Sequence, residues 1–164
     1  MNPAPDGSSN VGAEELDAGE WTAHCHVCEM RNRSTPQDLI YQDDLWTATV
    51  AQDAPGWIMV QANRHGEDWL WGLTSSEAGS LGPLLKRLTR ALKEVSNANR
   101  VYLQALGENS LHFHALLIPR LPDTPADWRG PTLIHHINDL ADPTGCRLTA
   151  GRLRDALAGG QEDT

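Results

Sequence analysis

The alternation of apolar and polar residues predicts a β-hairpin early in the chain. Residues 39–41 and 45–50 are rich in β-branched and aromatic side chains, and Asp43-Asp44 lies between them, as in two strands joined by a turn. Ala54-Pro-Gly56 is a further turn, and Trp57-Ile-Met-Val60 follows it. This part of the sequence therefore predicts a hairpin followed by a third strand.

The middle of the chain has the pattern of one long helix. Thr74-Ser-Ser-Glu77 fits a capping box. Gly79, Gly82 and Pro83 weaken the first turns, so a kink or a late start is expected. The apolar residues that follow recur at helical spacing and form one stripe: Leu81, Leu84, Leu85, Leu88, Leu92 and Val95.

Two more strands are predicted after this helix, at 100–103 and 111–118, with a short turn at 107–109 between them. A last helix is expected from about 149 to 157, ending at Gly159-Gly160. The order is a hairpin, a strand, one long helix and another hairpin. It predicts an α+β domain with an antiparallel sheet.

Two histidines one residue apart lie in the strand predicted at 111–118. Side chains at a spacing of two point to the same face of a strand, so His112, His114 and Leu116 are expected on one face. Two imidazoles on an apolar strand cost desolvation free energy unless they bind something or take part in chemistry. This strand is therefore the first candidate for a functional site.

Composition and charge limit the classes of function. The 164 residues fit one domain with a real core. Residues 1–20 are rich in Pro, Gly, Ser and acidic residues, which predicts a disordered tail and not a signal peptide. No apolar stretch approaches membrane-spanning length, so a cytoplasmic location is expected. A net charge of −9 argues against an extended nucleic acid as partner, but it permits a small phosphate ester in a local pocket.

Cys25-x-x-Cys28 has the spacing of metal ligands or of a redox pair. Structural zinc favours four Cys and His ligands in a tetrahedron. His65 and His112 each lie at or near a predicted strand and complete such a set, so zinc is favoured. The other histidines that compete for the third and fourth positions are His24, His26, His135 and His136.

Residues 21–120 resemble the histidine triad (HIT) superfamily. The resemblance rests on Cys25-x-x-Cys28, on Pro55-Gly56-Trp57 leading to Arg64-His65, on the capped helix, and on Gly107 with His112-x-His114-x-Leu-Leu-Ile-Pro-Arg120. It implies a HIT-like antiparallel sheet with one long helix and a zinc knuckle near the N-terminus. We expect this HIT-like domain at 21–122, followed by a C-terminal extension at 123–164 that contains a short helix.

The resemblance also implies roles for particular residues. His114 would be the nucleophile that attacks the α-phosphorus of a nucleotide, and Zn²⁺ would be held by Cys25, Cys28, His65 and His112. Phosphate donors are expected at Gly107, Asn109 and Ser110. A homodimer is expected through the long helix and the strand after Gly56, where the chain is rich in Trp.

Two departures from the HIT pattern leave two functions open. Leu116 replaces the third histidine, where relatives that transfer uridylyl groups carry Gln, and Leu can neither donate nor accept a hydrogen bond. Val50-Ala51 occupy the place of the acidic residue that holds the ribose. One hypothesis is a hydrolase or nucleotidyl transferase that acts on a nucleoside phosphoramidate or dinucleoside polyphosphate through a nucleotidyl-histidine at His114. The alternative is a non-catalytic, zinc-stabilised module that binds a nucleotide or a protein, with His114 as a hydrogen-bonded core histidine.

Overall fold

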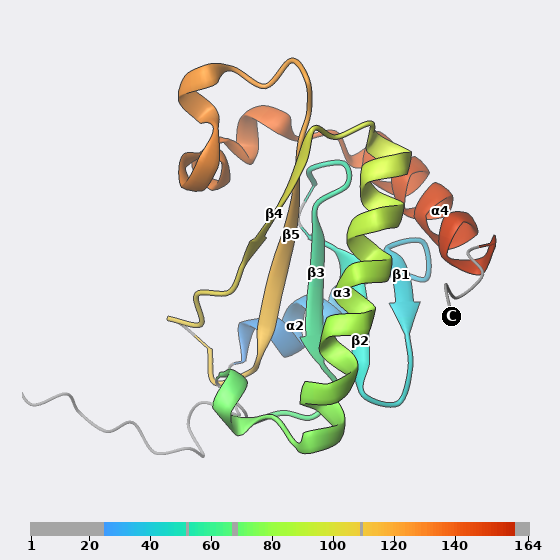
Figure 1. Cartoon of the computed structure of the whole chain (residues 1–164), viewed down its shortest axis with the longest axis vertical. Helices are drawn as coiled ribbons and strands as arrows, with labels where there is room; N and C mark the ends of the chain where they lie inside the picture. Colours follow the sequence, from blue (N-terminus) through green and yellow to red (C-terminus); the bar gives the residue numbers. More distant parts are fainter. Residues whose placement is uncertain (1–24, 52, 67–68, 109, 160–164) are drawn as a thin grey trace, which may run out of the picture.

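A five-stranded antiparallel sheet forms the centre of the computed structural model, which describes residues 25–51, 53–66, 69–108 and 110–159 (Figure 1). The order across the sheet is β1-β2-β3-β5-β4, and each neighbouring pair is antiparallel. The predicted α+β class is confirmed, whereas the predicted tail at 1–20 lies outside the described residues. The strands are β1 (Leu39–Gln42), β2 (Trp46–Val50), β3 (Ile58–Ala62), β4 (Arg100–Gln104) and β5 (His114–Arg120).

β5 begins at His114, three residues later than predicted. The backbone bonding to β3 continues to Phe113, whose carbonyl accepts from the Ala62 N–H at 3.1 Å. His112 lies before the strand, and its imidazole reaches back to the Ala62 carbonyl at 2.7 Å. The bend that directs His112 to this contact ends the regular strand, so the prediction of a strand from 111 was wrong at its start.

The helix α3 (Ser75–Ser96) packs on one face of the sheet, in front of it in Figure 1. Thr74 Oγ1 accepts from the Glu77 N–H, and the Glu77 carboxylate accepts from the Thr74 N–H, so the capping box is confirmed. The expected late start was wrong. The satisfied cap and four buried leucines of the stripe hold the first turns in place despite Pro83.

The helix α4 (Pro143–Gly159) lies beside α3 and the edge strand β1, and is longer than the predicted 149–157. Asp142 Oδ1 accepts from the Gly145 N–H at 2.9 Å, which supports the earlier start. Ala150 and Leu153 are buried in the core that α3 covers. The chain beyond Arg120 therefore completes the core of the sheet.

The other face of the sheet is covered by a short helix, α2 (His26–Arg33), and by irregular turns. The Gly130 N–H donates to the Tyr102 hydroxyl at 3.0 Å and ties these turns to β4. Both coverings thus lie on the face that carries His114. These turns are 3₁₀ segments at Ala126–Trp128, Gly130–His136 and Asn138–Leu140. A separate 3₁₀ segment, Leu70–Gly72, precedes α3.

Within the described part of the chain, no helix combines the length and apolar character needed to cross a membrane.

Candidate zinc centre and ligand pocket

Four predicted metal ligands come together at one end of the sheet. Cys25 caps α2, Cys28 lies in its first turn, His65 follows β3 and His112 precedes β5. Their ligating atoms all lie within 4.8 Å of one another. The Cys28 Sγ lies 3.2 Å from His65 Nδ1 and 3.3 Å from His112 Nδ1, and Cys25 Sγ lies 3.5 Å from His112 Nδ1. A tetrahedral ion with Zn–S about 2.3 Å and Zn–N about 2.0 Å places S and N about 3.5 Å apart, so the set fits zinc.

The surroundings of the cluster favour the metal-binding forms of the ligands. His112 is completely buried, and its Nε2–H donates to the Ala62 carbonyl at 2.7 Å, which leaves Nδ1 for the metal. Burial lowers the pKa of His112 and keeps the imidazole neutral. Burial and the neighbouring Cys25 raise the pKa of the Cys28 thiol, so a cation is needed to hold both cysteines as thiolates. The Cys28 N–H and the Ser110 hydroxyl lie 3.4 and 3.3 Å from the Cys25 sulfur.

The competing histidines that the structure describes do not join this cluster. His26 is exposed on α2 and faces the pocket described below. His135 is exposed, and His136 stacks on the Trp128 ring with 3.9 Å between ring centres. The remaining competitor, His24, lies outside the described residues. With two imidazole nitrogens in contact with the two thiols, a metal site explains the arrangement better than a redox pair does.

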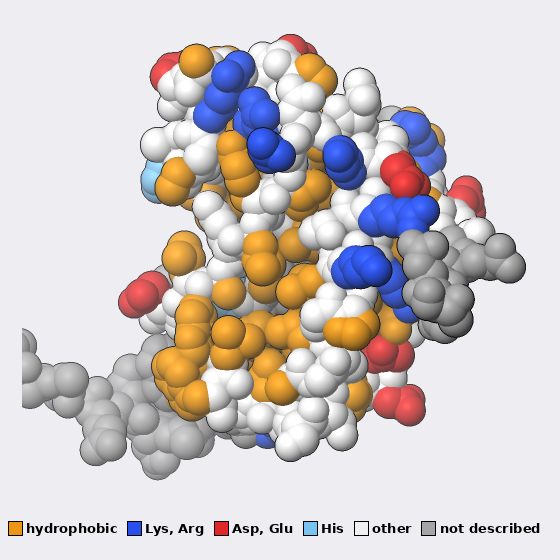
Figure 2. Space-filling view, in the orientation of Figure 1, with side chains coloured by type: hydrophobic (Ala, Val, Ile, Leu, Met, Phe, Trp, Pro, Cys, Tyr) orange, Lys and Arg blue, Asp and Glu red, His pale blue; other side chains and the backbone are white. Residues whose placement is uncertain are grey.

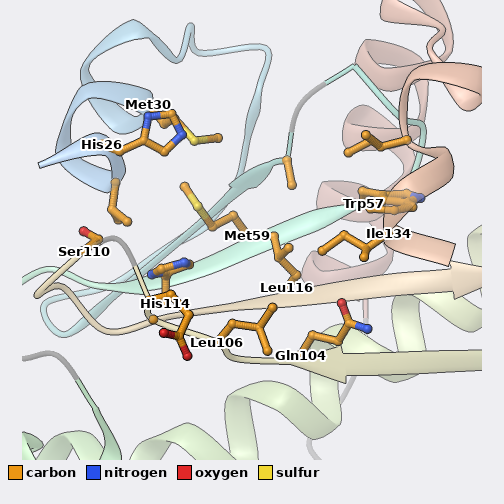
Figure 3. Close-up of a pocket in the computed structure, with 15 residues that line it drawn as sticks. His26, Met30, Trp57, Met59, Gln104, Leu106, Ser110, His114, Leu116 and Ile134 are labelled. Atoms are coloured by element: carbon orange, nitrogen blue, oxygen red, sulfur yellow. The ribbon is translucent and has the colours of Figure 1, made fainter. Parts of the chain in front are cut away.

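A cavity of about 570 Å³ lies next to the zinc ligands on the same face of the sheet (Figure 3). One end is polar, with His114, Ser110 and Gly107, and His26 lies across the cavity from His114. The other end is apolar and is made by α2, the sheet and the 3₁₀ turns. The apolar wall consists of Val27, Met30, Ala51, Trp57, Met59, Leu106, Leu116, Ile134 and Ile137, and the two remaining polar residues of the lining are Gln104 and Glu108.

The ring of His114 lines this cavity, and one of its two nitrogens is hydrogen-bonded to the backbone. Its Nδ1 lies 2.9 Å from the backbone carbonyl of His112, so Nδ1 carries the hydrogen and donates it. The Nε2 atom then has a free lone pair. Of the predicted phosphate donors, Gly107 and Ser110 line the same cavity, whereas Asn109 lies outside the described residues. The hydroxyl of Ser110 contacts Cys25, and its backbone N–H donates to the Gly107 carbonyl at 3.5 Å, so both donors of Ser110 are already engaged within the protein.

Several residues of the cavity had no signal in the sequence. Trp57 is buried in the strand region after Gly56 and also forms part of the cavity wall. Ile134 and Ile137 come from irregular turns, and their neighbours His135 and His136 stay outside the cavity. Gln104 is placed in the wall by strand pairing, which the sequence alone does not show.

Known proteins share this architecture at low sequence identity. No protein-family model matches the chain, and no curated protein matches it. A Zn-bound histidine triad family protein from Mycobacterium smegmatis is 19% identical, with a TM-score of 0.61 over 84% of this chain and 95% of that protein. A histidine triad protein from Bradyrhizobium japonicum is 22% identical, with a TM-score of 0.64 over 84% and 98% of the two chains. A uridylyltransferase is 21% identical, with a TM-score of 0.63 over 88% of this chain.

The fold and the metal cluster define an α+β protein with a Cys₂His₂ zinc site at the end of an antiparallel sheet. The similar structures show that this is the fold of histidine triad proteins, as the sequence motifs predicted. The chain matches 49% of the length of the uridylyltransferase, so that likeness concerns only half of the larger protein.

Proposed function

We propose that the protein is a member of the histidine triad superfamily that binds a nucleotide or nucleotide-derived phosphate ester and transfers or hydrolyses its nucleotidyl group slowly. The observation that supports this most is the orientation of His114. Its Nδ1–H is held by the His112 carbonyl, which leaves Nε2 free, and its ring lines a cavity that Gly107 and Ser110 also line. A fixed tautomer with a free Nε2 is what a nucleophilic imidazole requires.

The proposed reaction has two steps. In the first, His114 Nε2 attacks the α-phosphorus, the bond from phosphorus to the leaving group breaks, and a nucleotidyl-histidine forms. The leaving group departs with the bonding electron pair and takes a proton from solvent. In the second, water or an acceptor hydroxyl attacks phosphorus and loses its proton to solvent, the bond from phosphorus to Nε2 breaks, and His114 is released as the neutral imidazole. The backbone N–H of Gly107 would stabilise the developing negative charge on oxygen. The zinc ligands have the closed set typical of a structural site, so zinc would fix the walls of the cavity.

The charge of the cavity supports slow turnover. Its described lining contains no Lys or Arg, and it includes the carboxylate of Glu108. Neutral donors therefore have to offset the charge of a bound phosphate. Glu108→Gln removes a like charge near the phosphate and should tighten AMP binding about two- to fivefold at low salt, as measured by calorimetry. Unchanged affinity would show that Glu108 does not face the phosphate.

The second candidate function is the non-catalytic binding module, and the observation that favours it is Leu116. It lies two residues from His114 on the same strand and contributes an apolar side chain to the cavity. If the cavity serves only for binding, a histidine at this position adds a buried polar group without a partner and lowers stability by about 1–3 kcal/mol.

Kinetics with adenosine phosphoramidate and a dinucleoside polyphosphate separate the two functions. For the enzyme, we expect measurable turnover, loss of it in His114→Ala, and faster turnover in Leu116→His, because an imidazole at 116 would face the same phosphate. Equal and negligible turnover by wild type and Leu116→His, with AMP binding intact, would support the module and refute the enzyme.

A homodimer is proposed, but one of the two elements expected to form its surface, the strand after Gly56, is not accessible to a partner. The strand after Gly56 is β3, which lies in the middle of the sheet with all five residues buried, so it offers no surface to a partner. The edge strand β4 carries the exposed Leu103, and the turn before α3 exposes Leu70 and Trp71. Figure 2 shows apolar side chains gathered on this side of the molecule. Light scattering that shows a monomer at micromolar concentration would refute the dimer.

The cytoplasmic location expected from the sequence stays a prediction.

A further inference from the structure

Gln104 is a polar residue with an unsatisfied atom inside the apolar end of the cavity. It is the last residue of β4 and lines the cavity. Its Oε1 is buried and has no hydrogen-bond partner among the described residues. The residue is half-buried, and a buried amide oxygen without a partner costs free energy unless a bound molecule donates a hydrogen bond to it. This side chain therefore indicates a ligand group at that place.

Strand pairing places Gln104 beside the departure from the histidine triad pattern. Gln104 of β4 is paired directly with Leu116 of β5. Directly paired residues of an antiparallel sheet project from the same face, with Cβ atoms about 4.5–5.5 Å apart. Both side chains line the cavity, and Figure 3 shows the Gln104 carboxamide directed into it on the side of Leu116 and Ile134. A polar group is thus present next to the position where a polar group is missing from β5.

We propose that Gln104 provides, from β4, the hydrogen bond to the phosphate or leaving group that Leu116 cannot provide from β5. The inference rests on the proposed function and specifies one of its contacts. A carboxamide offers two N–H donors and one acceptor, whereas leucine offers none. The donors would stabilise negative charge that develops on the phosphate or on the departing atom.

A carboxamide differs from an imidazole in one respect that determines the substrate class. It does not release a proton at neutral pH, so it stabilises the leaving group without protonating it. The protein should therefore prefer phosphate esters whose leaving group is already stable as an anion, such as a phosphate or an acidic phenol. Amine leaving groups, which need a proton, should react more slowly.

The test removes the amide and then returns it from the other strand. Gln104→Met keeps the length of the side chain and should lower the single-turnover rate with a 4-nitrophenyl ester of AMP about 100- to 1000-fold. If the wild type binds AMP without turnover, the same substitution should weaken AMP binding about tenfold. Gln104→Met with Leu116→Gln should recover at least tenfold of the loss. Leu103→Met, one residue away on the other face of β4, is the control and should change neither quantity.

The outcomes separate this inference from the proposed function. If the single-turnover rate and the AMP affinity of Gln104→Met are both within twofold of the wild-type values, the inference is overturned and the proposed function is left intact. A wild type that neither binds AMP nor turns over the ester overturns the proposed function. Zinc content and circular dichroism check that each variant is folded. If Gln104→Met does not fold, Gln104→Glu keeps the shape of the side chain, and because it has no donor and adds a like charge, its loss should be at least as large.

Discussion

The ion pair between Glu77 and Arg64 should stabilise the fold strongly at neutral pH. Glu77 is 3% exposed, and its carboxylate accepts from Arg64 Nε at 3.1 Å and Nη2 at 2.8 Å. It also accepts from the Thr74 N–H at 2.7 Å. Arg64 directly precedes the zinc ligand His65, so the pair joins the metal-binding loop to the start of α3. The Arg64 hydrogen bonds lower the pKa of Glu77 from 4.5 to about 2.

The size of the effect follows from this pKa. The fall of the Glu77 pKa from 4.5 to about 2 corresponds to roughly 3 kcal/mol, at about 1.36 kcal/mol per pH unit. The Arg64 side chain is 38% exposed, so solvent screening reduces the expected contribution to about 2 kcal/mol. Glu77→Gln should therefore lower the free energy of unfolding by about 2 kcal/mol at pH 7, measured by urea denaturation of the zinc-loaded protein.

The pH dependence provides a second measurement. Because the folded state lowers the pKa of Glu77, the stabilisation is present above the unfolded pKa of about 4.5 and is lost as pH falls toward 2. The difference between wild type and Glu77→Gln should fall by about half between pH 5 and pH 3. Glu94→Gln breaks an exposed pair with Arg90 and should cost less than about 0.5 kcal/mol. A Glu77→Gln cost as small as this control, or one that grows as pH falls, would refute the reasoning.

Three further predictions concern the metal, a turn and a buried thiol. Elemental analysis should find about one zinc per chain. Cys25→Ser should abolish zinc binding and lower the free energy of unfolding by several kcal/mol, and zinc retained in this variant would contradict the site. Gly56→Ala should cost about 1–3 kcal/mol in urea denaturation, because φ is +79° and a Cβ would lie 3.2 Å from Leu92 and Pro119; a neutral effect would contradict this. Cys146 is 3% exposed, and burial raises the pKa of its thiol to about 11. Iodoacetamide at pH 8 should therefore not label Cys146 in the folded protein, as measured by mass spectrometry, and rapid labelling would contradict this.

The zinc ligands could be predicted from the sequence because their chemistry restricts the choice. Thiolates and neutral imidazoles are the ligands that structural zinc prefers, and a Cys-x-x-Cys pair needs only two more. The strand pattern then indicated which histidines the sheet can bring to the pair. The side chains of β5 also alternate as predicted, with Leu117 in the core under α3 and Leu116 on the opposite face.

The ligand pocket could not be predicted in the same way, because its walls depend on tertiary contacts. α2 has only eight residues and a weak apolar pattern, so its first turn gave no helical signal. Ile134 and Ile137 belong to 3₁₀ turns without a regular period. The position of Gln104 beside Leu116 depends on the register of β4 against β5, and a single sequence does not fix that register.

The metal site and the pocket are built from the same segments, and this determines how zinc would act on function. α2 directs Cys28 to the metal and Met30 to the cavity, while the chain around β5 directs His112 to the metal and His114 to the cavity. The His112 carbonyl that fixes the His114 tautomer belongs to a zinc ligand. Loss of zinc would therefore disturb His114, the proposed nucleophile, without any contact between metal and substrate. A dependence of turnover on zinc is expected from this geometry, and it would report the position of His114, not catalysis by the ion.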